Sequence, residues 1–131
     1  MILSAAHLAA RDAAARLPAL QASFDLLDAG AGQASIVIRD AADTVLVTIP
    51  IAEGVGTIDA QTYQIILAVP IEAQIATAGT PDHAIIYDNT GAVWADGVTV
   101  SDEAGSGEIK LASMSLQAGA FCRLTSAVFQ G

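Results

Sequence analysis

The sequence predicts an all-β domain, an antiparallel β-sandwich or barrel of about seven strands, with an N-terminal helix or arm before it. From residue 34 onward, apolar and β-branched residues alternate with a period of two. Clusters of Gly, Asp, Asn and Pro separate these segments at regular intervals, as turns do. Helical spacing is confined to the start of the chain. We therefore divide the chain into a helix or arm at residues 1–30 and a β-sandwich domain at 31–131.

The first element is a helix predicted over residues 4–17. Ser4 is a suitable N-cap, and Asp12 and Arg16 are spaced four residues apart in the favourable order. Pro18 is expected to end or kink the helix. One apolar stripe recurs at helical spacing: Leu3, Ala6, Ala10, Ala13 and Leu17. Because most of this stripe is alanine, the helix needs a docking surface on its own domain or on a neighbouring protein.

The strands follow in order, each bounded by turn residues. Loops are predicted at 53–56, 76–82 and 101–107, where glycine and acidic residues gather. The predicted strands are "ASIVIRD" (34–40), "TVLVTIPI" (44–51), "TYQIILAVP" (62–70), "HAIIYD" (83–88), "AVWADG" (92–97), "EIKLAS" (108–113) and "AFCRLTSAVF" (120–129). These seven segments support the predicted sandwich or barrel.

The stretch "AIIYDNTGAVWADGVTV" raises a question about Trp94, the single tryptophan. Two short strands flank "NTG", which is typical of a tight hairpin. Successive strand residues point to opposite faces, so either Tyr87 or Trp94 lies on the outer face of the hairpin. Two interpretations stay open: Trp94 fills the core, which is the more common arrangement, or it marks an interface.

Composition and charge exclude several classes of protein. The net charge is −9, and the five basic residues are scattered, which disfavours binding to nucleic acid or to anionic membranes. The single cysteine, Cys122, excludes a disulfide within the chain and a cysteine-based zinc site, and it is expected to be a buried thiol. The start of the chain lacks the features of a signal peptide, and no apolar run approaches the length of a membrane span. We expect a soluble protein made in a cytoplasm.

The sequence offers little for catalysis, so we expect no enzyme, no cofactor and no metal centre. His7 and His83 lie far apart, and Asp82 beside His83 is expected to point away from it because adjacent strand residues face opposite sides. Two oxygen-rich turns, residues 88–91 and 101–108, leave a calcium site open as an alternative, but neither fits the EF-hand pattern. Paired carboxylates for glycoside hydrolysis stay a further alternative.

Part of the chain resembles a family of small structural proteins of tailed-bacteriophage virions. The resembling segments are "HAIIYDNTGAVWADGVTV" and "GSGEIKLASMSLQAGAFCRLTSAVFQG", with "LVTIPIA" and "GTIDAQTYQI" upstream. They share an apolar and aromatic strand, a D-x-x-G-x-V turn, a D-G-x-V segment, a glycine and acidic loop, and a final strand after an "AG" turn. The resemblance extends from Val45 to the end of the chain.

The resemblance implies a head decoration (cement) protein that binds the outer surface of the phage head and stabilises contacts of the major capsid protein. It implies a trimer, assembled in the bacterial cytoplasm, with no catalytic residues. We expect the N-terminal helix to be an arm on the capsid, with interface residues Ile2, Leu3, Leu8 and Trp94. The alternatives are a tail or head–tail joining protein, or a carbohydrate-binding module that uses Trp94 or Tyr87.

Overall fold

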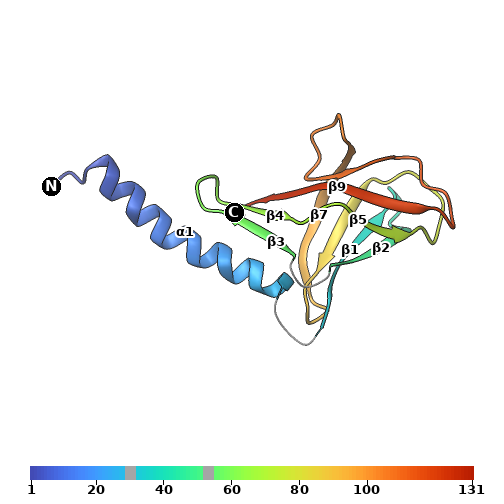
Figure 1. Cartoon of the computed structure of the whole chain (residues 1–131), viewed down its shortest axis with the longest axis horizontal. Helices are drawn as coiled ribbons and strands as arrows, with labels where there is room; N and C mark the ends of the chain where they lie inside the picture. The colour runs from blue at the N-terminus through green and yellow to red at the C-terminus, as the bar shows by residue number, and fades with distance from the viewer. Residues whose placement is uncertain (29–31, 52–54) are drawn as a thin grey trace.

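The computed structural model describes residues 1–28, 32–51 and 55–131 of the chain (Figure 1). In this part it contains helix α1 (Ala5–Asp28) and nine strands. The strands are β1 (Ala34–Arg39), β2 (Val45–Ile51), β3 (Gly56–Asp59), β4 (Gln64–Leu67), β5 (Ile71–Gln74), β6 (His83–Tyr87), β7 (Val93–Asp102), β8 (Ile109–Leu111) and β9 (Phe121–Gln130). The chain is therefore largely β, with one N-terminal helix, as predicted.

The strands form one curled sheet in the order β2-β1-β6-β7-β8-β9-β4-β3, and β5 pairs with β9 beside this path. The sheet curls far enough to bring β2 close to the end of β5, where the amides of Ala76 and Thr77 donate to the Leu46 carbonyl at 2.9 and 3.2 Å. The alternating burial of β4, β6 and β9 places one face of each strand in the enclosed core.

The prediction that the strands are all antiparallel is wrong at β7 and β8, which pair in parallel from Val100 opposite Ile109. The short connection between them is held by side chains. The Gly107 amide donates to the Ser101 hydroxyl, and the Glu108 amide donates to the Thr99 hydroxyl, both at 2.9 Å. These bonds fold residues 103–108 back against the end of β7. β8 therefore starts beside Val100 and runs parallel to β7.

The core lies inside the curl and is built from aliphatic side chains of most strands. The largest fully buried side chains are Leu27, Ile36, Ile38, Leu46, Ile49, Ile65, Ile86, Ile109, Leu111, Leu124, Val47 and Cys122. Leu27 comes from α1, so the helix contributes to the same core as the strands. Burial of Cys122 agrees with the sequence prediction and raises the pKa of its thiol to about 11.

Two strands were not predicted, and the strands predicted at 62–70 and 108–113 are shorter than expected. The strand predicted at 92–97 is longer and continues as β7 into the predicted loop at 101–107. β3 begins at the last residue of the predicted loop at 53–56 and runs through residues to which no element was assigned, and β5 falls between the predicted strands. The segment 62–70 was expected to be one strand, but only Gln64–Leu67 is extended, and it pairs with β3 and β9. Part of the predicted loop at 53–56 and the predicted domain boundary after residue 30 lie outside the described residues.

Helix α1 begins as predicted and ends at Asp28, eleven residues beyond the helix predicted over residues 4–17. The Ser4 hydroxyl accepts a hydrogen bond from the His7 amide at 3.2 Å, which is the expected N-cap contact. Pro18 lies inside the helix, which continues to Asp28. Good helix formers follow the proline, and Leu20 and Leu27 in this second half are buried, so their packing offsets the missing hydrogen bond.

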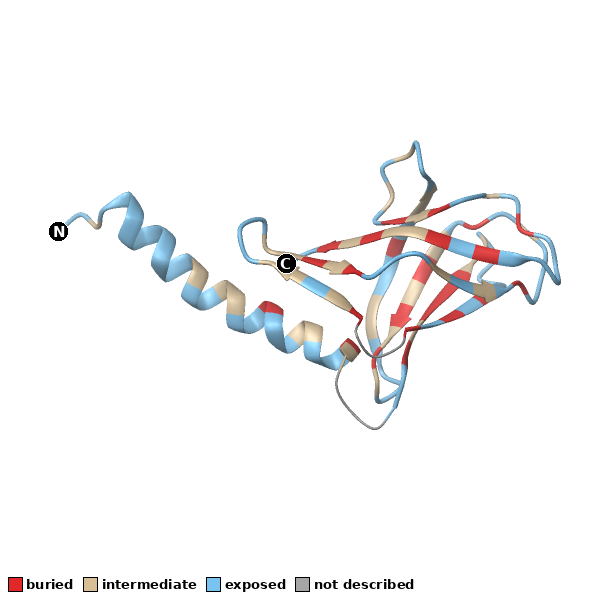
Figure 2. Cartoon of the chain, in the orientation of Figure 1, coloured by how far each residue is buried: buried red, intermediate tan, exposed pale blue. Residues whose placement is uncertain are grey.

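The two halves of α1 differ in their surroundings. The C-terminal half lies beside the sheet, while the N-terminal half projects away from it (Figures 1 and 2). Residues 4–12 are all exposed, whereas buried and half-buried residues recur from Ala13 to Asp28. The part of the stripe at Ala6 and Ala10 therefore has no cover from the described part of the β-domain.

Candidate interaction site: helix α1 and its anchor

The second half of α1 is fixed to the sheet by an apolar stripe that continues the one predicted from the sequence. Leu20 and Leu27 are 5% and 2% exposed, and Phe24 packs against the same core. Their spacing of four and three residues places them on one face of the helix. The helix predicted from the sequence ended before Pro18 and so did not include this face, although the apolar residues keep their helical spacing past the proline.

The turn between β6 and β7 closes the C-terminal end of the helix. The Asn89 amide donates to the Leu26 carbonyl at 2.9 Å, and the Asn89 side chain donates to the Asp25 carbonyl at 3.2 Å. The last carbonyls of a helix have no partner within the helix, so these two bonds satisfy groups that would otherwise need water. Gly32 lies against the Asn89 carbonyl, where a Cβ atom would clash.

The Asp88 carboxylate orders this turn by accepting hydrogen bonds from two of its other residues. Its side chain accepts hydrogen bonds from the Thr90 amide at 2.8 Å, the Thr90 hydroxyl at 2.6 Å and the Ala92 amide at 3.1 Å. The bonds from Thr90 hold the pKa of the buried Asp88 carboxyl below its usual value. Gly91 has φ of +86°, which favours glycine there. The turn is thus rigid, and it presents Asn89 to the helix.

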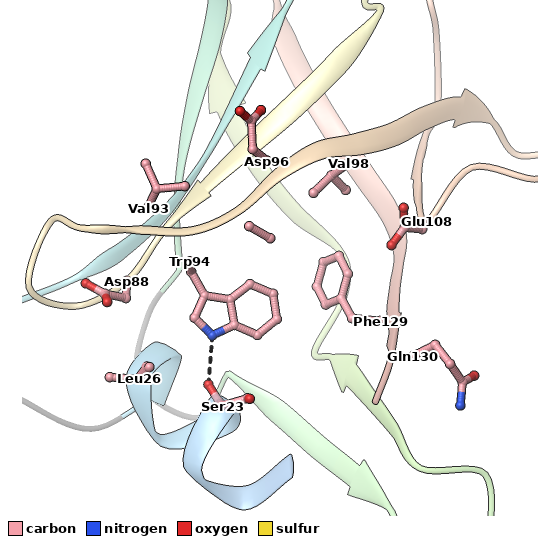
Figure 3. A pocket seen from close by; sticks show the side chains of 11 residues that line it. Ser23, Leu26, Asp88, Val93, Trp94, Asp96, Val98, Glu108, Phe129 and Gln130 are labelled. Atoms are coloured by element: carbon pink, nitrogen blue, oxygen red, sulfur yellow. Dashed lines mark hydrogen bonds between the residues drawn. The ribbon is translucent and has the colours of Figure 1, made fainter. Parts of the chain in front are cut away.

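Trp94 joins the helix to the sheet (Figure 3). Its indole Nε1 donates to the Ser23 carbonyl at 2.9 Å. The indole ring also meets Phe129 edge to face, with ring centroids 5.5 Å apart and an interplanar angle of 66°. The half-buried Trp94 therefore connects three elements: α1, β7 and β9.

Arg16 anchors the helix at the point where its two halves meet. Its guanidinium lies over the Tyr63 ring, 3.8 Å from the centroid, and donates to the Gly131 carbonyl at 3.0 Å. It also pairs with Asp12 at 3.4 Å, as the sequence spacing predicted. Because Tyr63 and Gly131 belong to the β-domain, the helix is held at both ends of its docked half.

A groove of about 440 Å³ lies beside this anchor, between the end of α1 and strands β7 and β9 (Figure 3). Its walls are apolar at Leu26, Val93, Trp94 and Phe129, with the carboxylates of Asp88, Asp96 and Glu108 at the rim. Asp88 is occupied by its turn, and one oxygen of Glu108 accepts from the Thr99 hydroxyl at 3.2 Å. The groove therefore has a mixed lining of apolar and polar side chains, and three of the polar ones are carboxylates.

The structure separates the four residues predicted for the interface. Ile2 and Leu8 are 98% and 52% exposed, and Leu3 is half-buried. Trp94 lies at the other end of the helix, where its polar atom is used within the chain. Ile2 and Leu8 are thus available to a partner. Trp94 takes part in the packing of its own chain. The interface itself stays a prediction.

The expectation that Asp82 points away from His83 is wrong. Asp82 precedes β6 and is not constrained by its pleat, and its carboxylate lies 2.9 Å from His83 Nδ1. Asp43, from the turn between β1 and β2, lies 2.8 Å from Nε2. The hydrogen bond to Asp82 is the main cause that raises the pKa of His83. Both ring nitrogens are therefore occupied, and this cluster ties the turn to the start of β6.

The oxygen-rich turns use carboxylates to order their own backbone. The Asp102 carboxylate accepts from the Gly105 amide at 2.9 Å, as Asp88 does from its own turn. Among the described residues, no group of three or more His, Cys, Asp or Glu side chains could hold a metal ion. Across residues 1–28, 32–51 and 55–131, no helix is long and apolar enough to span a membrane.

Comparisons with known proteins give no further identification. No protein-family model, no curated protein and no solved structure matches the chain.

Proposed function

We propose that this chain is a decoration protein that binds the outer surface of a bacteriophage head and bridges subunits of the major capsid protein. The proposal combines the resemblance of residues 45–131 with one structural observation. Helix α1 is firmly anchored over its second half, while its first half projects from the sheet with apolar residues exposed. A projecting segment on a rigid anchor is suited to binding a neighbouring protein.

The chemistry of the chain supports a role that depends on binding energy alone. Residues 1–15 carry Ile2 and Leu8 as exposed large side chains, which would gain free energy when a capsid subunit covers them. The net charge of −9 suits the outer surface of a shell, away from the packaged DNA. The contacts between β2 and the segment after β5 also support the finer description of the domain as a barrel.

The test is a cryo-electron microscopy map of the virion whose genome encodes this chain. We expect density for the β-domain on the outer shell at three-fold or quasi-three-fold positions, with α1 directed at capsid subunits. Density confined to the tail or the portal vertex would overturn the proposal in favour of a tail or head–tail joining protein. Absence of the chain from the virion would overturn both.

A chain that begins at Arg16 tests the role of the projecting half. It keeps the contacts of Arg16, Leu20 and Leu27, so we expect its β-domain to unfold at nearly the native urea concentration. We expect it to lose binding to heads in a cosedimentation assay. Unchanged binding would show that the arm is not the capsid contact.

A carbohydrate-binding module is the second candidate, and the groove beside Trp94 favours it. An aromatic wall with a few polar groups is a usual lining for a small-molecule site, and the Trp94 indole offers a ring on which a sugar could stack. A glycan array separates the two functions: binding that disappears in Trp94→Ala but persists in the matched variant Tyr87→Ala would favour the module.

A further inference from the structure

Helix α1 carries a second apolar face, which its own β-sheet does not cover. We call this face the outer seam; it consists of Ala5, Leu8, Asp12, Ala15, Ala19, Ala22 and Leu26, all exposed. The intervals alternate between three and four residues along nearly the whole helix. This 3.5-residue period is the one by which two helices pack side by side over many turns. The outer seam therefore has the spacing that suits packing against another long helix.

The outer seam is complementary to itself when two copies run antiparallel. Placing Leu8 opposite Leu26 also places Ala15 opposite Ala19, so large side chains meet at both ends and small ones meet in the middle. The small residues let the two backbones approach closely near the two-fold axis. Asp12 is the one polar member, and its carboxylate pairs with Arg16 of the same helix at 3.4 Å.

Charge favours the same arrangement. Arg11 and Asp25 flank the outer seam on the same side, and both are exposed. In an antiparallel pair related by a two-fold axis, equal flanks face each other, so Arg11 of each copy approaches Asp25 of the other. A parallel pair would instead set unequal flanks against each other, which places Arg11 near Arg16 of the other copy. The two pairs of opposite charge favour the antiparallel orientation. On the other flank Arg16 of each copy faces Arg16 of the other, and each keeps its own Asp12 as a counter-charge.

The groove beside Trp94 is continuous with this surface. Leu26 belongs both to the outer seam and to the groove wall, next to the exposed Val93. In the antiparallel arrangement, Leu8 of the second copy lies over Leu26 and can enter the groove. The second copy would thus cover three exposed apolar side chains: Leu8, Leu26 and Val93.

We propose that two copies of this chain form an antiparallel dimer through the outer seams of their α1 helices, with Leu8 of each copy seated at the groove of the other. The proposal does not depend on binding to a phage head. Its two-fold symmetry differs from the trimer implied by the resemblance. The overlap from Leu8 to Leu26 is about 27 Å long. Such a narrow contact falls below about 1,200 Å², which is typical of weak complexes.

Analytical ultracentrifugation over a concentration series tests the proposal with charge-reversed variants of the full chain. Arg11→Asp and Asp25→Arg each replace two attractive pairs per dimer by repulsive ones, so we expect each variant alone to associate at least about tenfold more weakly. A mixture of the two variants restores both attractive pairs in the heterodimer, so we expect native-like association on mixing. Arg123→Asp makes the same change on the exposed face of β9 and should leave association unchanged.

Three results would overturn the proposal. The first is a native chain that stays monomeric at every concentration, and the second is a mass of three copies. The third is a mixture of the two charge variants that associates no better than either alone. Circular dichroism of each variant shows that the fold is intact; Asp25→Arg keeps the carbonyl that accepts from Asn89, because only the side chain changes.

Discussion

Leu26 and Leu27 are adjacent leucines on α1, and their truncation tests whether the second half of the helix is part of the folded core. Leu27 is 2% exposed and belongs to the same core as the strands, whereas Leu26 is 44% exposed. Leu27→Ala removes a buried side chain and leaves a cavity, which costs roughly 2–4 kcal/mol. Leu26→Ala removes a side chain that is already partly in water, so the monomer loses about 0.5–1 kcal/mol.

Urea unfolding of both variants, followed by circular dichroism and tryptophan fluorescence, measures the difference. Leucine and alanine both favour helix, so the comparison isolates burial from helix propensity. Trp94 reports on the anchor itself because it contacts the helix at the Ser23 carbonyl. The measurements are made at low concentration, where the chain is monomeric. If the two variants lose the same free energy of unfolding within about 0.5 kcal/mol, the docked position of α1 is wrong.

Three further predictions concern single side chains. Trp94→Phe keeps an aromatic ring but removes the donor to Ser23, and should lower the free energy of unfolding by about 1 kcal/mol in urea titrations. His83 has a raised pKa, so the stability it contributes is fully present below its unfolded pKa of about 6.5 and is lost as pH rises through the folded pKa. The stability difference between the native chain and His83→Gln should therefore be larger at about pH 5.5 than at about pH 8.5; an equal difference would contradict the contacts with Asp82 and Asp43. Cys122, buried and with a pKa of about 11, should react with a thiol reagent at pH 8 far more slowly in the native protein than in urea.

The strands with strong alternation could be predicted from the sequence, and those held by pairing alone could not. β1, β6 and β9 follow runs of β-branched and aromatic residues, and the structure places each within a residue or two of the predicted bounds. β5 reads Ile-Glu-Ala-Gln, which has little intrinsic preference for a strand. Its extension depends on pairing with β9, from Ile71 opposite Leu124 to Gln74 opposite Phe121. Such long-range pairing leaves no local signal.

In the candidate site too, local contacts could be predicted from the sequence, whereas contacts between distant residues could not. The N-cap at Ser4 and the pair of Asp12 with Arg16 are local contacts, and their spacing alone predicted them. The contacts of Trp94 with Ser23 and of Arg16 with Tyr63 join residues far apart in the chain. Only the fold brings them together. The helix beyond Pro18 was the avoidable error, because the apolar period continues there.

Asn89 and Trp94 of the β6–β7 hairpin both contact helix α1, so these side chains contribute to the position of the helix as well as to the hairpin. A helix of about 12–15 residues is marginal in water, and residues 5–17 form such a segment, with Pro18 removing one backbone donor behind it. Its continuity with residues 19–28 keeps it helical, and those residues are held by Asn89 and Trp94. The Asn89 side chain and the Trp94 indole nitrogen both donate to carbonyls of the helix and not within the hairpin. The anchor thus keeps the projecting helix in line with its docked half and leaves the outer seam exposed.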